Sequence, residues 1–216
     1  MKCVAISDAH SNLDFSIPEC DLLLMAGDML PAYCDCGLSI DMQINWLEDI
    51  FIPWTDKQPV KEIISVAGNH DWVFDMLKNE IPKMNDNFHY IEEEIIEIFG
   101  LKIYGSPYQP EFCSWAFNKT EDDLRDYHWS KIPEGLDILL LHGPPYGILD
   151  VNCGGTHIGS PSLLNRIISV KPRYAIFGHN HKDGGKTEIL NGTTYINASL
   201  LNEPYKMDHK PVVFEI

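Results

Sequence analysis

Histidine, aspartate and asparagine, residue types that bind divalent metals, occur in five short blocks along this chain. The blocks are Asp8-Ala9-His10, Gly27-Asp28, Gly68-Asn69-His70-Asp71, His142-Gly143 and His179-Asn180-His181. Imidazole nitrogens mixed with carboxylate and amide oxygens, without a thiolate, favour manganese, iron or zinc over calcium. We therefore expect metal ligands at seven positions: Asp8, His10, Asp28, Asn69, His142, His179 and His181.

The spacing within these blocks suits shared metal binding. Asp8 and His10 are two residues apart, so in an extended strand end both side chains would point to the same side. His179 and His181 repeat this spacing, and the carboxylate of Asp28 could bridge two cations. Taken singly, each residue is more often a turn, cap or loop residue. Recurrence in five blocks makes metal binding the better interpretation.

A pair of such metals indicates hydrolysis of a phosphate ester. Two divalent ions about 3.5–4 Å apart lower the pKa of a shared water, hold a phosphoryl oxygen and allow in-line attack by the bridging hydroxide. The leaving oxygen needs a proton, and His70, next to Asn69, is our candidate catalytic donor. Asp71 has two interpretations: it orients His70 as part of the catalytic apparatus, or it caps a helix that begins near Trp72.

Strands that end beside one another are needed to bring these blocks together. Apolar residues with helical spacing occur at 40–50 and 162–170. Short apolar or β-branched runs elsewhere in the chain are typical of strands, and five of the runs lead directly into one of the blocks. In open α/β sheets ligands gather beyond the carboxyl ends of the strands. The pattern therefore predicts an α/β fold with strands at 2–7, 22–26, 63–67, 95–98, 101–105, 138–141, 174–177, 193–196 and 212–216.

Length and charge limit the function further. The chain has 216 residues, of which 44% are hydrophobic, and this predicts a single domain over residues 1–216. The formal net charge of −16 at pH 7 argues against long DNA or RNA as a partner. A small phosphate ester remains compatible because bound cations supply positive potential locally. The first apolar stretch is too short for a signal peptide or a membrane span, so we expect no membrane partner and a cytoplasmic location.

The six cysteines are expected to be free thiols, because a chain of this size has a core that does not need a disulfide framework. Cys34 and Cys36 give a weak metal signal. No second cysteine pair completes a zinc site, so the favoured interpretation is a loop with two incidental thiols.

In order and spacing, the five blocks resemble the calcineurin-like metallophosphoesterases, and the resemblance covers nearly the whole chain. It implies a four-layer α/β/β/α sandwich of two mixed sheets. It also implies two divalent metal ions that share one carboxylate. The implied ligands are Asp8, His10, Asp28 and His181 for one ion, and Asp28, Asn69, His142 and His179 for the other.

A narrower likeness, to the small metallophosphoesterase-domain branch that includes animal brain proteins and bacterial relatives, lies in residues 104–107, 109–112, 115–118, 142–145 and 194–199. It implies phosphodiester substrates, including cyclic nucleotides. Four aromatic residues of this region form either a wall for a nucleotide base or ordinary core packing: Tyr108, Phe112, Trp115 and Phe117.

Two other functions are compatible with the same residues. A phosphomonoesterase or a nuclease would share the metal core, although the absence of a basic stripe counts against a nuclease. A protein-binding scaffold would keep the fold and lose turnover, and the intact ligand set counts against it. The substrate, the metal and the oligomeric state stay open at this point.

Overall fold

The structure of the protein is a computed structural model that describes residues 1–32, 40–78 and 80–216. Cys34 and Cys36, the weak metal signal of the sequence, lie outside the described residues. The four described cysteines are free thiols; Cys3 and Cys20 are buried, and Cys113 and Cys153 are exposed. Among the described helices, none is both long enough and apolar enough to cross a membrane.

The first sheet has five strands in the order β13-β1-β2-β3-β4. Four are parallel and β13 runs antiparallel to β1. The central strands are continuous apolar runs whose residues are buried on both faces, as expected of a parallel sheet covered on both sides. The bounds are β1 Lys2–Ile6, β2 Cys20–Ala26, β3 Val60–Val66, β4 Phe88–Tyr90 and β13 Val212–Glu215.

The second sheet has six strands in the order β11-β12-β10-β9-β6-β5. Its four inner strands are parallel, and β5 and β11 form antiparallel edges. A short two-stranded ribbon, β7–β8, lies outside it. The bounds are β5 Glu94–Ile98, β6 Leu101–Ser106, β7 Gln109–Pro110, β8 Asn118–Lys119, β9 Ile138–Leu141, β10 Tyr174–Phe177, β11 Thr187–Leu190 and β12 Thr193–Asn197.

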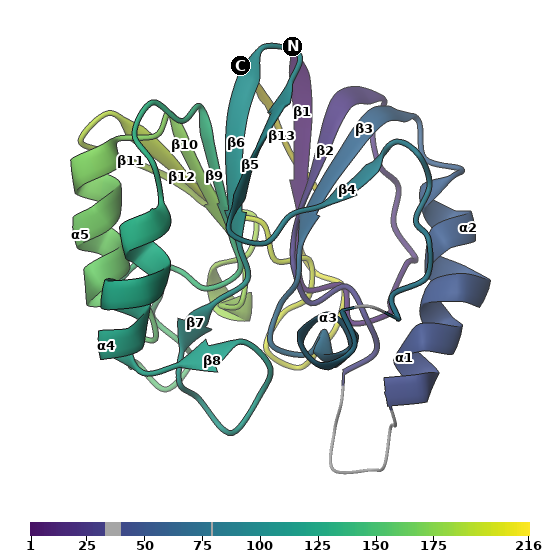
Figure 1. Cartoon of the computed structure of the whole chain (residues 1–216), viewed down its shortest axis with the longest axis horizontal. Helices are drawn as coiled ribbons and strands as arrows, with labels where there is room; N and C mark the ends of the chain where they lie inside the picture. The colour runs from purple at the N-terminus through teal and green to yellow at the C-terminus, as the bar shows by residue number, and fades with distance from the viewer. Residues whose placement is uncertain (33–39, 79) are drawn as a thin grey trace.

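The two sheets face each other, and helices cover their outer faces (Figure 1). Between the sheets lies a core that includes Ala5, Leu24 and Ile64 from the first sheet and Leu140 and Ile176 from the second. A second core lies between the first sheet and its helices, and a third between the second sheet and α5. The predicted four-layer α/β/β/α sandwich of two mixed sheets is confirmed.

The predicted helices at 40–50 and 162–170 are present with shifted ends. The first continues through a π turn at Leu47–Phe51 and past Pro53 to Thr55. The second begins where the Ser160 side chain accepts a hydrogen bond from the backbone N–H of Leu163, and it ends at Val170, before Lys171 in a left-handed conformation. The α-helices are α1 Ile40–Trp46, α2 Ile52–Thr55, α3 Trp72–Met76, α4 Glu121–Asp123 and α5 Pro161–Val170. Short turns of other helix types span Leu124–His128, Trp129–Lys131 and His181–Asp183.

The carboxyl ends of the parallel strands in both sheets lie at one end of the molecule. In Figure 1 the two chain termini are at the top, and the loops that follow β1, β2, β3, β9 and β10 lie away from them. A parallel bridge between Ser7 and Ser199 joins the two halves there. The fold therefore brings the loops with the five sequence blocks to one place.

Candidate metal centre

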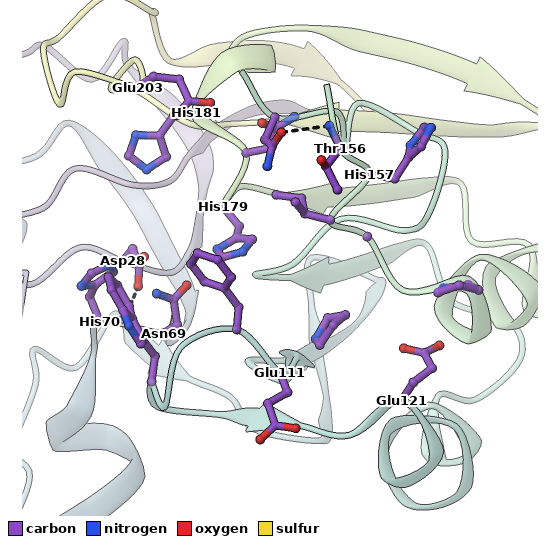
Figure 2. Close-up of a pocket in the computed structure, with 18 of the residues that line it drawn as sticks. Asp28, Asn69, His70, Glu111, Glu121, Thr156, His157, His179, His181 and Glu203 are labelled. Atoms are coloured by element: carbon purple, nitrogen blue, oxygen red, sulfur yellow. Dashed lines mark hydrogen bonds and ion pairs between the residues drawn. The ribbon is translucent and has the colours of Figure 1, made fainter. Parts of the chain in front are cut away.

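The predicted ligand side chains converge between the two sheets. The nitrogen and oxygen atoms of Asp8, His10 and His181 lie within 4.8 Å of one another, as do those of Asp8, Asp28 and His142. All five residues are buried. Figure 2 shows Asp28, Asn69, His179 and His181 gathered on one side of the adjoining pocket.

Asp28 occupies the middle of this arrangement. Its Oδ2 atom is 3.8 Å from His10 Nε2 on one side and 3.4 Å from His142 Nε2 on the other. Its Oδ1 atom accepts a hydrogen bond from the backbone N–H of His70 at 2.7 Å. One carboxylate oxygen therefore faces histidines of both donor groups.

Backbone carbonyls hold two of the histidines so that one nitrogen faces the centre. His142 Nδ1 is 2.8 Å from the carbonyl oxygen of Ala26, and His181 Nδ1 is 3.1 Å from that of Asn202. A donated N–H at Nδ1 leaves Nε2 as the free nitrogen, which is the usual arrangement at metal sites. The free Nε2 atom of His142 lies 2.9 Å from Oδ1 of Asn69, so these two predicted ligands are adjacent.

Asp8 carries the observation that best tests whether a cation fits. Its Oδ2 atom accepts hydrogen bonds from Ser199 Oγ at 2.7 Å and from the backbone N–H of His179 at 2.9 Å. Its buried Oδ1 atom has no hydrogen-bond partner among the described residues, although His181 Nε2 is 3.4 Å away. A buried acceptor without a donor, beside imidazole nitrogens, fits a bound cation because the cation would supply the missing partner.

The electrostatics of the centre keep the carboxylates ionised and several imidazoles neutral, the forms that bind metals. Burial would raise the pKa values of Asp8 and Asp28, but the neighbouring histidines hold both pKa values well below the usual range. Burial lowers the pKa of His10 to about 4, and burial together with His142 lowers the pKa of His179 to about 3. His142 differs: burial lowers its pKa, but the attraction of Asp28 outweighs this and raises the pKa to about 9.

Four predicted ligands have a left-handed backbone, which is uncommon outside glycine. The φ angles are 53° at Asp8, 43° at His10, 53° at Asp28 and 64° at His179. The expectation that Asp8 and His10 sit in an extended strand end is therefore wrong, because β1 ends at Ile6 and the chain turns sharply. Strain of this kind is found where the surrounding structure fixes a functional geometry.

His179 lies at the edge of the centre. Its ring centroid is 5.1 Å from that of His142, and its side chain lines the pocket. It is outside the three clusters of close His and Asp atoms found among the described residues. The structure therefore brings six of the seven predicted ligands into direct contact distance and places the seventh beside His142.

His70 faces the same centre from the loop before α3. Its Nε2 atom is 4.0 Å from Asp28 Oδ2, and its ring is buried. It forms a third cluster of possible ligand atoms with His10 and Asp28. The ring of His70 therefore lies beside the predicted ligands His10 and Asp28.

Asp71 does not follow either interpretation of its side chain. It is at the position before α3, but its carboxylate makes no capping hydrogen bond to that helix. In the described residues, its oxygens accept hydrogen bonds from the backbone N–H groups of Asp28 at 2.8 Å, Gly68 at 2.8 Å and Leu30 at 3.1 Å. Burial and the Asp28 carboxylate raise the pKa of Asp71 to about 7, against the lowering effect of the bonds from Gly68 and Leu30. Asp71 thus joins two ligand loops and does not contact the ring of His70 through a hydrogen bond.

A pocket of about 640 Å³ opens from the centre. Two of the four aromatic residues from this region of the sequence, Phe112 and Trp115, line the pocket. The other two do not: Phe117 is buried in the core, and Tyr108 packs on His128. Figure 2 shows Glu111, Glu121 and Glu203 around the pocket, away from His70 and Asn69. The described lining contains no lysine or arginine.

Three supporting residues were missed in the sequence. Gln43 is buried, donates from Nε2 to the carbonyl of His70 at 2.6 Å and accepts at Oε1 from Val73 N at 3.1 Å. Ser199 holds Asp8, and Tyr205 packs against His10 and His181 with centroid distances of 4.9 Å. A polar glutamine inside an apolar helical pattern was the one available signal for Gln43. Ser199 falls within residues 194–199, which carry the narrower likeness, but nothing in that run links it to Asp8, and Tyr205 gave no signal.

Comparison with known proteins agrees with this geometry. The family model described as calcineurin-like phosphoesterase matches residues 1–183. The chain is 33% identical to human Metallophosphoesterase domain-containing protein 1, over all of this chain and 71% of that protein. It is 32% identical to a UPF0046 protein of Caenorhabditis elegans, over all of this chain and 60% of that protein.

Solved structures agree at the level of the fold. GAP50, described as the anchor in the inner membrane complex of Plasmodium, matches with a TM-score of 0.52 and 13% identity, over 93% of this chain and 71% of that one. The sequence match, the two facing sheets and the buried His and Asp cluster all point to the same family. The chain belongs to the calcineurin-like phosphoesterase family.

Proposed function

We propose that the protein hydrolyses a small phosphodiester, with cyclic nucleotides as the candidate substrates, at a centre of two divalent ions. The observation that carries the proposal is the position of Asp28, whose Oδ2 atom lies 3.8 Å from His10 Nε2 and 3.4 Å from His142 Nε2. The seven residues proposed as ligands are Asp8, His10, Asp28, Asn69, His142, His179 and His181. Manganese, iron or zinc suits this donor set.

When bound, such ions supply the positive charge that activates a water and holds the phosphoryl oxygens. The chain's own residues orient this chemistry. Ser199 and the backbone of His179 fix Asp8, and Ala26 fixes the His142 ring through Nδ1. Hydrolysis adds the oxygen of water to phosphorus and releases an alcohol, and His70 donates the proton that the leaving oxygen takes up.

A diester suits the pocket better than a monoester. At neutral pH a diester carries one negative charge on its phosphate, whereas a monoester carries close to two. The described pocket lining has three glutamates, Glu111, Glu121 and Glu203, and no lysine or arginine to offset additional negative charge. The same argument disfavours polyphosphates and long nucleic acids.

We also propose that residues 1–216 form one domain, since β13 pairs with β1 and β12 lies inside the second sheet.

The test is an assay of metal-stripped protein reconstituted with Mn²⁺, using bis(p-nitrophenyl) phosphate, p-nitrophenyl phosphate and then cyclic nucleotides. We expect higher kcat/KM for the diester. Asp28→Asn is expected to lower kcat/KM by about 100-fold or more, because it removes the shared carboxylate. His89→Ala is the matched control: His89 on β4 pairs with Glu62 on β3, away from the centre, and turnover should persist.

Other outcomes identify the competing functions. Preference for p-nitrophenyl phosphate would replace the phosphodiesterase with a phosphomonoesterase. Absence of turnover with Mn²⁺, Fe²⁺ and Zn²⁺ alike, in a protein that binds these ions, would support the non-catalytic scaffold.

A further inference from the structure

The His70 imidazole, like that of His10, lacks the Nδ1 hydrogen bond that holds His142 and His181 in place. His142 and His181 each direct Nδ1 to a backbone carbonyl. The Nδ1 atom of His70 is buried and has no hydrogen-bond partner among the described residues. A catalytic histidine must keep its reactive nitrogen aimed at the substrate, so another contact has to fix this ring.

The backbone of His70 is fixed on both sides. Its N–H donates to Asp28 Oδ1 at 2.7 Å, and its carbonyl accepts from Gln43 Nε2 at 2.6 Å. These bonds set the position of the Cα atom but leave the two side-chain torsions free. Rotation of the imidazole would move Nε2 away from its place 4.0 Å from Asp28 Oδ2.

Two aromatic rings restrict that rotation. The indole of Trp115 is nearly perpendicular to the His70 ring, with centroids 3.6 Å apart and an interplanar angle of 84°. The His10 ring is 4.8 Å away, also at 84°. His10 is a proposed ligand, so Trp115 is the contact that is free to serve the orientation of His70. At this separation the indole restricts the imidazole sterically, because rotation of the His70 ring would drive it into Trp115.

Trp115 is itself attached to the His70 loop. The next residue, Ala116, donates its N–H to the carbonyl of Asn69 at 3.2 Å, and Phe117 donates its N–H to Asp75 Oδ2 of α3 at 3.3 Å. The segment that carries Trp115 lies between β7 and β8, outside the sheet from which His70 comes. These bonds hold the segment that carries the indole against the loop that carries His70.

We propose that Trp115 is a positioning residue that holds the His70 ring in the orientation required for proton donation to the leaving group. The inference rests on the proposed function and deepens it, because it assigns the control of leaving-group protonation to the segment between β7 and β8. Phe112, on the same segment, also lines the pocket, but its ring contacts Trp115 and His179, at centroid distances of 6.4 and 6.5 Å. Phe112 therefore provides a matched control.

The experiment compares p-nitrophenyl methyl phosphate with phenyl methyl phosphate, whose leaving phenol is less acidic and needs the proton more. For Trp115→Ala we expect kcat to fall by about 10-fold on the phenyl ester and by less than about 2-fold on the p-nitrophenyl ester. Trp115→Phe, which keeps an aromatic ring, should recover most of the loss. Phe112→Ala should change KM and leave the ratio of the two kcat values as in the parent protein.

A double-mutant cycle shows whether Trp115 acts through His70. If it does, Trp115→Ala added to His70→Ala should lower kcat on the phenyl ester by less than about 2-fold further. Full additivity would overturn the proposal. A direct readout is the NMR shift of the His70 ring protons in the metal-free protein: the ring-current shift should vanish in Trp115→Ala and remain in part in Trp115→Phe, and unchanged shifts in Trp115→Ala would overturn it too.

The same data separate this inference from the proposed function. Failure of the parent protein to hydrolyse either ester would refute the proposed function. Equal losses for both esters in His70→Ala would refute the role of His70. If His70→Ala loses more kcat on the phenyl ester than on the p-nitrophenyl ester, and Trp115→Ala loses equally on both, only the role of Trp115 is refuted.

Discussion

The Asp71 carboxylate accepts hydrogen bonds from three backbone N–H groups that belong to the two loops after β2 and β3. Asp28 N and Gly68 N donate to Oδ2, and Leu30 N donates to Oδ1. A carboxylate has two acceptor oxygens and can satisfy all three donors. This side chain therefore fixes the distance between the loops that carry Asp28 and Asn69.

Replacing Asp71 with Asn should destabilise the fold even without metal. The amide oxygen can take the place of Oδ2, but the amide nitrogen then faces the N–H of Leu30 and leaves that buried donor unpaired. We expect the free energy of unfolding to fall by about 1–3 kcal/mol, measured by urea unfolding in the presence of a chelator. Asp75→Asn is the control, because Asp75 accepts one bond, from Phe117 N at 3.3 Å, at a half-buried position. An equal loss in the two variants would contradict this role of Asp71.

The chemical types of the candidate site could be predicted from the sequence, but its local conformation could not. Asp8, Asp28 and His142 follow apolar runs, and their convergence follows from the rule that parallel strands end at one edge. The left-handed backbone at Asp8 and His179 depends on contacts across the chain, such as the bond from Ser199 to Asp8. Side-chain partners 191 positions apart leave no local pattern to detect.

At the level of elements, the close approach of the two sheets depends on Gly178, the residue after β10. A Cβ atom there would collide with Asp8 Oδ2 and Ser7 Oγ and would lie 2.6 Å from Ser7 Cβ. The glycine therefore allows the loop before His179 to pass directly over the loop after β1.

Gly178→Ala should separate the two loops and weaken the centre. We expect thermal unfolding at a lower temperature, with a loss of about 1–3 kcal/mol, and weaker Mn²⁺ binding by titration calorimetry. Gly154→Ala is the control: its added Cβ would meet Asn152 Oδ1 at 3.2 Å, and Gly154 itself does not line the pocket, although its neighbours Asn152 and Thr156 do. Unchanged Mn²⁺ affinity in Gly178→Ala would show that the approach of the loops is not needed for the site.

Most buried elements could be predicted from their apolar patterns, whereas exposed or short ones could not. The hairpin β5–β6 and the parallel strands β9 and β10 match the predicted ranges closely. All four residues of β11 are exposed, so this edge strand has no alternation of buried and exposed positions. The first helix continues past Pro53, which usually ends a helix, because the preceding turn widens into a π turn.

At the scale of the whole molecule, the net charge of −16 opposes the approach of any anionic substrate. The pocket rim adds to this, because Glu111, Glu121 and Glu203 line it. Positive charge at the centre would act only over the short distance that salt does not screen.

The rate of substrate capture should therefore rise with salt. Between about 0.01 and 0.15 M NaCl, where the screening length falls from about 30 to 8 Å, we expect kcat/KM for bis(p-nitrophenyl) phosphate to increase about two- to fivefold while kcat stays constant. The increase should follow ionic strength and be equal for NaCl and KCl. A decrease in kcat/KM with salt would mean that attraction by the centre outweighs the repulsion of the surface.

The pairing of β1 with β13 has a consequence for how the protein is made. The amino group of Met1 donates to the carbonyl of Ile216 at 3.0 Å. Strand β1 therefore gains one of its two neighbours only when β13 has been synthesised. On the ribosome, Asp8 and Asp28 emerge well before His142 and His181, and the two carboxylates then lack the imidazoles that offset their repulsion. Such long-range pairing is slow to form. The nascent chain is therefore expected to complete its first sheet only after β13 has left the ribosome, and its centre only after His181 has done so.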